Sequence, residues 1–160
     1  MKLRIISIGH KAPTWVQMGF DEYFKRILPM ITVQVVEIPP VKRSKNPSAG
    51  EIDKCKLQEG ELILAVRLPK EKLWVLEVTG KMLSTETLAD RLSYAMQDGQ
   101  DVALVIGGAD GVSKAVLAAA DFKWSLSDLT LPHPLVKVIL MEQLYRAMSI
   151  IHHHPYHRGG

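Results

Sequence analysis

The stretch DVALVIGGADGVSKAVLAAAD, residues 101–121, reads as three consecutive pieces of structure. Residues 101–106 are apolar after the first position, which is typical of a strand buried on both faces. The glycines of residues 107–111 then predict a tight turn, and residues 113–121 predict a short helix. A buried strand, a turn and a helix in this order form the repeating unit of an α/β protein with a parallel sheet.

Strands and helices alternate through the rest of the chain as well. Strand patterns cover residues 2–8, 32–38 and 73–78, and helical patterns cover residues 14–28, 51–68 and 84–99. Pro13 and Thr14 are start signals for the first helix, whereas Ser84 and Gly99 cap and end the third. Residues 124–134 are expected to be irregular. This alternation of strand and helix patterns predicts a single α/β domain, residues 1–160, with a mostly parallel sheet flanked by helices.

The last helix, which begins near Pro134, carries an unusually wide apolar surface. In LVKVILMEQLYRAMSII, residues 135–151, twelve of seventeen positions are apolar or aromatic. A helix that covers one face of a sheet needs only a single stripe. We therefore expect burial on two sides, with a second copy of the chain as the other partner in a homodimer. A central core helix within one protomer is the alternative.

Composition excludes several classes of protein. The chain has 160 residues, of which 47 % are hydrophobic and 23 % charged, and no apolar run approaches the roughly 20 residues that span a bilayer. The N-terminus lacks the pattern of a secretory signal, so we expect a cytoplasmic protein with no membrane partner. The single cysteine, Cys55, cannot form an internal disulfide and reads as a structural or surface thiol. The net charge of +3 permits nucleic-acid binding without requiring it.

Two loops are candidate ligand sites. GGADG, residues 107–111, does not match the dinucleotide fingerprint, but it follows a strand at the edge where open α/β sheets bind ligands. A plain tight turn is the alternative. SLSDLTLPHP, residues 125–134, is either a connection or a stiff loop, with prolines on both sides of His133, that presents main-chain groups to a flat heterocycle such as adenine.

The histidine-rich end, IIHHHPYHRGG, residues 150–160, suggests a zinc site at first sight. Adjacent histidines on a regular backbone cannot all reach one ion, and no HExxH or Cys/His set accompanies them, so no metal is expected. Pro155 and Tyr156 interrupt the histidines, which is unlike a purification tag. A frayed terminus without a function is the alternative. The run KRSK, residues 42–45, is either a solvated loop or a surface that contacts phosphates.

Taken together, several segments resemble the RlmH family of the SPOUT methyltransferase superfamily. They are, in order, KLRIISIGHKAPTWVQMGFDEYFKRI, EIPPVKRSKN, VIGGADG, LSDLTLPHPLVKVILMEQLYRA and PYHR. The resemblance covers nearly the whole chain. It implies a homodimeric enzyme that transfers a methyl group from S-adenosylmethionine to N3 of a pseudouridine in 23S ribosomal RNA, in the helix 69 region of assembled ribosomes. It also implies a trefoil knot in the C-terminal part, which no periodicity predicted.

The resemblance also implies which residues contact the cofactor. They are Leu76, Gly108, Ser127, Asp128, Leu129, Thr130, Leu131 and Pro132. Members of the family often carry Pro-Glu where this chain has Ala109 and Asp110. The loss of that proline predicts a looser loop around the cofactor.

Arg158, His157 and Tyr156 are hypothesised to be the catalytic residues. N3 of pseudouridine is a neutral imide nitrogen, which becomes a good nucleophile as its proton leaves. An imidazole could accept the proton and a guanidinium could stabilise charge on the flanking carbonyls, with the tyrosine against the base. His133 is a weaker candidate. Lys11, Lys42, Arg43 and Lys45 are assigned to rRNA phosphates.

Three other functions stay open at this point. A SPOUT methyltransferase could act on another RNA, such as tRNA, and would share the cofactor site. A nucleotide-binding protein could keep the fold without catalysis. A metal hydrolase would contain zinc, which the residue spacing does not favour.

Overall fold

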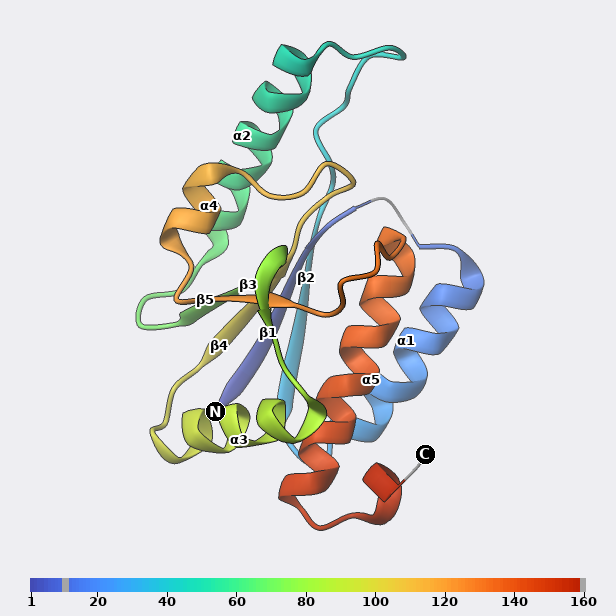
Figure 1. Cartoon of the computed structure of the whole chain (residues 1–160), viewed down its shortest axis with the longest axis vertical. Helices are drawn as coiled ribbons and strands as arrows, with labels where there is room; N and C mark the ends of the chain where they lie inside the picture. Colours follow the sequence, from blue (N-terminus) through green and yellow to red (C-terminus); the bar gives the residue numbers. More distant parts are fainter. Residues whose placement is uncertain (10–11, 159–160) are drawn as a thin grey trace.

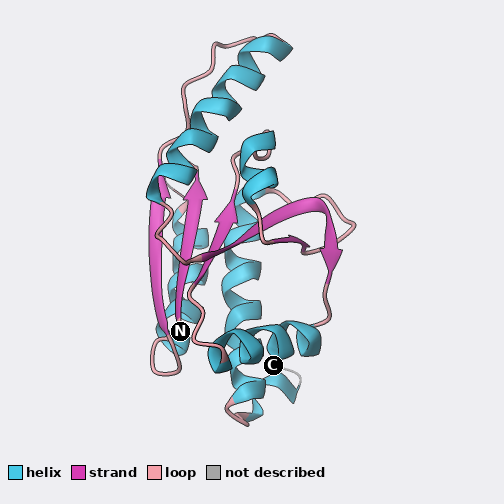
Figure 2. Cartoon of the chain, turned by 90° about the vertical axis from the view of Figure 1, so that its left-hand side faces the viewer, coloured by secondary structure: helices cyan, strands magenta, loops and turns pink. Residues whose placement is uncertain are grey.

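The computed structural model describes residues 1–9 and 12–158, and its centre is a five-stranded sheet. All four pairs of neighbouring strands are parallel, in the order β2-β1-β4-β3-β5. Figures 1 and 2 show β2, β1 and β4 running side by side, whereas β5, the edge strand of this order, runs across their direction. The strands are Lys2–Ile8 (β1), Thr32–Ile38 (β2), Lys72–Met82 (β3), Val102–Ile106 (β4) and Phe122–Ser125 (β5).

Helices cover both faces of this sheet, which confirms the predicted α/β class. The helices are Thr14–Ile27 (α1), Ala49–Val66 (α2), Thr85–Gln97 (α3), Lys114–Ala119 (α4) and His133–Ile151 (α5), followed by the 3-10 turn Pro155–Arg158 (η1). The predicted signals for α3 are confirmed, because the Ser84 hydroxyl accepts the Thr87 N–H and Gly99 follows the helix with φ +64°. No helix in the described part of the chain is long and apolar enough to span a bilayer.

The two faces of the sheet carry separate hydrophobic cores, because successive side chains of a strand point to opposite sides. In β1, Leu3 and Ile5 belong to the core with α1, α3 and α5, whereas Ile6 and Ile8 face α2 and α4. A strand that is covered on both faces is expected to be rich in apolar residues. β4 is apolar throughout, whereas β1 also contains the buried Arg4, which pairs with Glu71.

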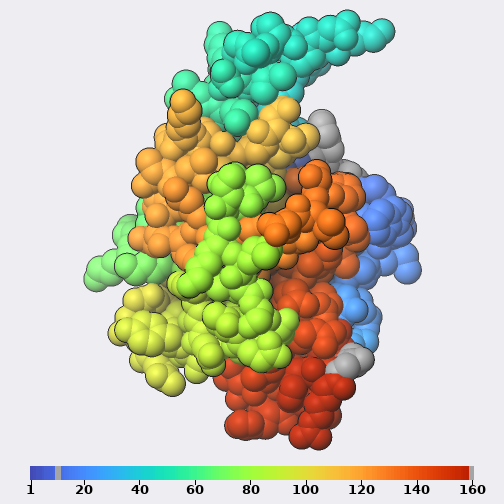
Figure 3. Space-filling view, in the orientation of Figure 1, coloured from blue at the N-terminus to red at the C-terminus, as the bar shows by residue number. Residues whose placement is uncertain are grey.

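Strand β3 is longer than its sequence pattern predicts, and its second half crosses over β5. Both Leu76 and Lys81 pair with Trp124, so the residues between them bulge away from the ladder. At the crossing, a Cβ on Gly80 would lie 2.7 Å from the backbone of Lys123 and Trp124. In Figure 3 the green end of β3 lies over the orange chain, which continues on both sides of it. β5 itself was missed, since residues 124–134 were expected to be irregular.

Helix α5 is buried within one protomer by α1, α3 and the sheet. Its fully covered residues include Leu140, Met141, Leu144 and Met148. Neighbours in the same chain therefore cover much of the apolar surface, whereas Leu135, Val136, Val138, Ile139, Ile150 and Ile151 are only partly covered. The homodimer stays a prediction.

Candidate functional site

A cleft of about 750 Å³ opens beside β3 and the ends of β4 and β5. It is lined by residues 76–78 of β3, by residues 106–112 and by residues 124–133 without Asp128, and also by Lys56 of α2, Lys114 and Leu117 of α4 and Val136 of α5. Parallel strands deliver their carboxyl ends to one edge, which is where open α/β sheets bind ligands. The volume lies within the range of about 300–1,000 Å³ that is usual for small-molecule sites.

The glycine loop, residues 107–111, forms one wall of the cleft with its backbone. Gly108 and Gly111 pair in a short bridge, and the Gly111 N–H donates to the Gly108 carbonyl at 3.0 Å. Gly111 has φ +82°, and a Cβ on Gly107 would lie 2.6 Å from Val112 Cγ1. The loop can therefore be this tight only with glycines at these two positions.

The opposite wall, residues 125–132, is held by its own hydroxyl groups. The Ser125 hydroxyl, which is buried, donates to the Ser127 carbonyl at 3.1 Å, and the Ser127 hydroxyl accepts the Leu129 N–H at 2.9 Å. Pro132 is the N-cap of α5 and fixes where the helix begins. These bonds leave the Leu129 side chain 73 % exposed at the mouth of the cleft.

His133, the first residue of α5, also lines the cleft. Burial lowers the pKa of His133, and the neighbouring Lys137 ammonium lowers it further, although a hydrogen bond with the Ile8 backbone opposes both effects. Its Nε2 atom is buried and has no hydrogen-bond partner among the described residues. A Cβ on Gly9 would lie 3.0 Å from Nε2, so the imidazole fills the space beside β1. The imidazole is therefore favoured in its neutral form.

Most residues that the sequence assigns to the cofactor line this one cleft. They are Leu76, Gly108, Ser127, Leu129, Thr130, Leu131 and Pro132. Asp128 belongs to the same loop, but its side chain is exposed and does not line the cavity. Backbone amides, apolar side chains and a few hydroxyls suit a ligand that combines a flat heterocycle with a polar chain. This set fits S-adenosylmethionine.

Tyr156 lies at the opposite end of α5 and points into the protein. Its ring centroid is 4.6 Å from that of Tyr145, and the Arg146 guanidinium lies 4.7 Å from its centre. Its hydroxyl donates to Glu142 Oε1 at 3.2 Å. Burial, with contributions from Tyr23 and Glu142, raises the pKa of Tyr156. The ring is thus held by α5 and α1, whereas the sequence suggested that it points outward.

His157 and Arg158 follow in η1 and are more accessible. His157 Nδ1 lies 2.6 Å from the His154 carbonyl oxygen, which can only accept a hydrogen bond. Nδ1 is therefore the donor of this hydrogen bond. Arg158 is exposed. Helix α5 has 19 residues and is therefore about 28 Å long, which separates this tail from the cleft of its own protomer (Figure 1).

The predicted phosphate-binding residues have different surroundings. Lys42 and Lys45 are exposed, whereas Arg43 is bound to Glu59 and Asp110. Lys11 lies outside the described residues. Sequence reasoning missed Glu59, which is only 3 % exposed. The sequence did contain a signal for the burial of Glu59, because Cys55, Glu59 and Ile63 follow one another at four-residue spacing on one helix face.

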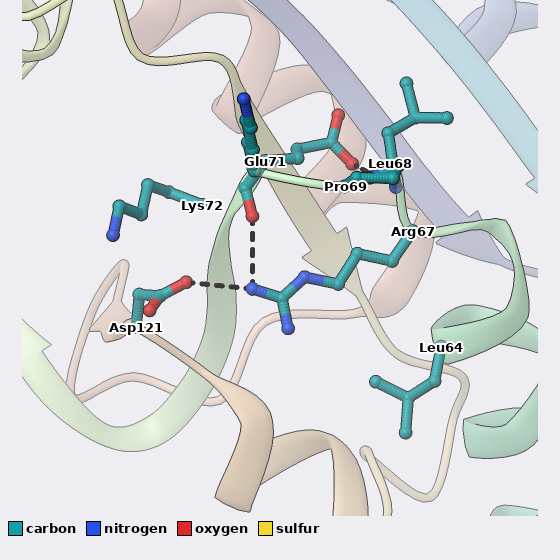
Figure 4. A pocket seen from close by; sticks show the side chains of 8 residues that line it. Leu64, Arg67, Leu68, Pro69, Glu71, Lys72 and Asp121 are labelled. Carbon is teal, nitrogen blue, oxygen red and sulfur yellow. Dashed lines mark hydrogen bonds and ion pairs between the residues drawn. The ribbon is translucent and has the colours of Figure 1, made fainter.

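A second cavity, of about 400 Å³, lies between the end of α2, the start of β3 and Asp121 (Figure 4). Arg67 donates to the Glu71 carbonyl and to Asp121 at 3.1 and 3.2 Å. These two hydrogen bonds connect residues that line the second cavity. No glycine loop lines this cavity. Within residues 1–9 and 12–158, no three His, Cys, Asp or Glu side chains gather in a way that could hold a metal ion.

Comparisons with known proteins agree with this architecture. A family model described as "Predicted SPOUT methyltransferase" matches residues 1–157. The chain is 66 % identical to ribosomal RNA large subunit methyltransferase H of Psychrobacter cryohalolentis, covering 99 % of each chain. It is 57 % identical to the protein of that name from Acinetobacter baumannii, covering 99 % of this chain and 100 % of the other.

A solved structure of a methylase family protein from Neisseria gonorrhoeae superposes with a TM-score of 0.53. It is 15 % identical, and the superposition covers 89 % of this chain and 81 % of the other. At this identity the likeness concerns the fold alone.

Proposed function

The chain belongs to the SPOUT methyltransferase family, and from this premise we propose that it methylates ribosomal RNA of the large subunit with S-adenosylmethionine as the methyl donor. The observation that carries the proposal is the cleft, because a glycine loop and a hydroxyl-braced loop enclose it at the carboxyl edge of the sheet. Near-complete coverage at 66 % identity to a large-subunit rRNA methyltransferase supports the substrate class.

We further propose that the acceptor is N3 of a pseudouridine in the helix 69 region of 23S rRNA, modified in assembled ribosomes in the cytoplasm. When bound, the cofactor supplies an electrophilic methyl group that needs no further activation. The protein has to hold the acceptor nitrogen in line, which can contribute about 7–11 kcal/mol. The residues that would hold the cofactor are those of the two loops, with Leu76 at the end of the regular part of β3.

Proton removal is assigned to the tail, together with stabilisation of the charge that develops on the acceptor base. His157 Nε2 is the free acceptor of a ring whose Nδ1 is held by the His154 carbonyl. Arg158 is exposed, so its guanidinium group is accessible from the solvent. Tyr156 is assigned a different role from the one the sequence suggested, because its contacts with Tyr145 and Glu142 make it the anchor of the tail.

The distance between tail and cleft supports a homodimer with composite sites. One tail cannot cover its own cleft across the length of α5. In a two-fold dimer whose α5 helices run antiparallel, each tail would approach the partner's cleft. Exposed apolar side chains beside the cleft, Val78, Met82 and Leu129, are the surface such a partner would cover.

Methylation of defined substrates tests the reaction. Labelled S-adenosylmethionine is incubated with whole ribosomes, free large subunits, naked rRNA or tRNA from cells that lack the modification. Incorporation at one pseudouridine of ribosomal rRNA is expected. Incorporation into tRNA instead would support another RNA substrate, and binding of the cofactor without transfer to any RNA would support a non-catalytic protein of this fold.

Mixing two inactive variants tests the composite site. Arg158→Ala removes the tail's guanidinium, and Leu131→Trp enlarges a side chain that lines the cleft. If the tail acts on the partner, each mixed dimer has one intact site, so random exchange restores about one quarter of the wild-type activity. If the tail acted on its own protomer, the mixture would stay inactive. Size-exclusion chromatography with light scattering checks that both variants remain dimers.

A further inference from the structure

Arg43 lies between the loop that precedes α2 and the glycine loop of the cleft. Its Nε donates to Asp110 Oδ2 at 2.8 Å, and Asp110 lines the cleft. Its two terminal nitrogens donate to Glu59 Oε2 and Oε1 at 2.9 and 3.2 Å. One guanidinium therefore joins α2 to the loop that forms a wall of the cofactor cleft.

Glu59 is the fixed point of this arrangement. Its side chain is 3 % exposed, and it also accepts the Val41 N–H at 2.9 Å. Its Oε1 lies 3.6 Å from where a Cβ on Gly108 would be, so the carboxylate sits directly behind the glycine loop. A buried carboxylate without its cation is costly, which ties Arg43 to this place.

The backbone behind the cleft is closely packed at the same point. Gly60, the neighbour of Glu59 in α2, lies against the Ser113 side chain, and the Ser113 hydroxyl accepts the Val116 N–H as the N-cap of α4. α2 therefore contacts the chain on the far side of the glycine loop as well. Among residues 1–9 and 12–158, the side-chain attachment of the loop on its outer side is the bond between Asp110 and Arg43.

A lysine could not make these bonds together. The planar guanidinium directs separate N–H groups at two carboxylates and at the Val41 carbonyl, which it reaches at 2.8 Å. Hydrogen bonds to Glu59 raise the pKa of Arg43 above its usual range, so the bridge keeps its charge at any working pH. The side chain is 19 % exposed, in contrast to the exposed Lys42 and Lys45 beside it.

We propose that Arg43 is a positioning residue for the cofactor, which holds the glycine loop in its binding shape through Asp110, and not a contact to RNA phosphate. The inference rests on the proposed function, because it takes S-adenosylmethionine as the ligand of the cleft.

Calorimetry with S-adenosylmethionine, without RNA, tests the proposal. Asp110→Asn leaves the buried pair of Arg43 and Glu59 in place and removes one charge of the bridge, so we expect Kd to rise about two- to fivefold. Arg43→Gln combined with Glu59→Gln removes the bridge without leaving an unpaired buried charge, and we expect a rise of at least the same size. Adding Asp110→Asn to this pair should weaken binding no further, because one bridge is already lost.

Lys45→Gln is the matched control, since it removes one charge from the same loop. It should leave the Kd of S-adenosylmethionine unchanged and lower the salt slope of ribosome binding by about one phosphate contact. Arg67→Gln, at the second cavity, breaks an ion pair of similar exposure and should leave both quantities unchanged.

Two readouts separate the positioning role from a general loss of structure. At saturating cofactor, single-turnover methylation by Asp110→Asn should return to the wild-type rate, whereas a damaged fold would stay slow. An unchanged Kd in the Asp110 and Arg43 variants, with a reduced salt slope for Arg43, would overturn the proposal and restore the phosphate contact. If the wild-type protein bound no S-adenosylmethionine at all, the proposed function itself would fail.

Discussion

Replacing Gly80 with alanine should separate the two chain segments that cross beside the cleft. A Cβ at this position would lie 2.7 Å from the Lys123 carbonyl carbon and the Trp124 nitrogen, and 2.8 Å from the Lys123 oxygen. Ordinary contact begins at 3.4 Å, and all three atoms are backbone. No side-chain rotation can relieve the overlap, so either β3 or β5 has to move.

The cost follows from the size of this movement. The contacts fall short of ordinary distance by 0.6–0.7 Å, in two strands that are paired with each other. Overpacking of this kind costs about 1–3 kcal/mol, and the rigid backbone places it at the upper end. For a chain of this length, about 3 kcal/mol lowers Tm by about 6–12 °C. β5 leads directly into Ser125 and the loop of the cleft, so methyl transfer should fall by more than about tenfold.

Thermal and urea unfolding of Gly80→Ala are compared with those of Gly50→Ala. Gly50 lies in the first turn of α2, where a Cβ would meet only Ser48 Oγ at 4.0 Å, so alanine there should stabilise the protein by about 0.5–1 kcal/mol. The change from glycine to alanine should thus lower the free energy of unfolding at position 80 and raise it at position 50. A Gly80→Ala protein with wild-type Tm and cofactor affinity would refute the close crossing of β3 and β5.

Three further outcomes follow from the site. Tyr156→Phe, which loses the bond to Glu142, should lower stability by about 0.5–1.5 kcal/mol and slow single-turnover methylation while calorimetry gives an unchanged cofactor Kd. The pKa of His133 is lower in the folded protein than in the unfolded chain, so its contribution to the free energy of unfolding is complete above about pH 6.5 and is lost as the pH falls through the lowered pKa. Urea unfolding of His133→Gln should therefore depend less on acid pH than that of the wild type. Lys42→Gln should reduce the salt dependence of ribosome binding and leave cofactor affinity unchanged, whereas an unchanged salt slope would remove Lys42 from the RNA surface.

The helices and strands with regular hydrophobic patterns were predictable, because the spacing of apolar residues depends on which sides of an element are buried. β4 is apolar along its length and β1 is mostly apolar since helices cover both of their faces, and Ser84 and Gly99 mark the ends of α3 through local backbone chemistry. The crossing of β3 over β5 was not predictable in this way. FKWS is four residues long, and the second half of β3 contains a glycine and exposed polar residues, so neither carries a strand pattern. Their pairing depends on contacts between distant segments.

The candidate site was predictable to the extent that it consists of backbone. The glycine loop follows a strand that periodicity predicts, so it was expected at the ligand-binding edge of the sheet. The strand before residues 125–132 was missed, so the resemblance, and not sheet geometry, assigned both loops to one cofactor. Side-chain partners could not be derived from spacing. Arg43 has two basic neighbours within KRSK, and only the fold shows that it packs against the buried Glu59 while the lysines face solvent. Tyr156 likewise follows a proline in a polar tail, yet its ring packs on Tyr145.

The arrangement around the cleft divides binding from chemistry. The cofactor side is built from glycines, hydroxyls and one buried ion pair, all held by α2, β3 and β5 of a single protomer. The tail, with the groups suited to proton transfer, is fixed to the other end of α5 by Tyr156. Under the proposed composite site, a single protomer binds the cofactor and the proton acceptor comes from the partner's tail. Cofactor affinity should then be independent of protein concentration, whereas methyl transfer should fall steeply when the protein is diluted below the dissociation constant of the proposed dimer.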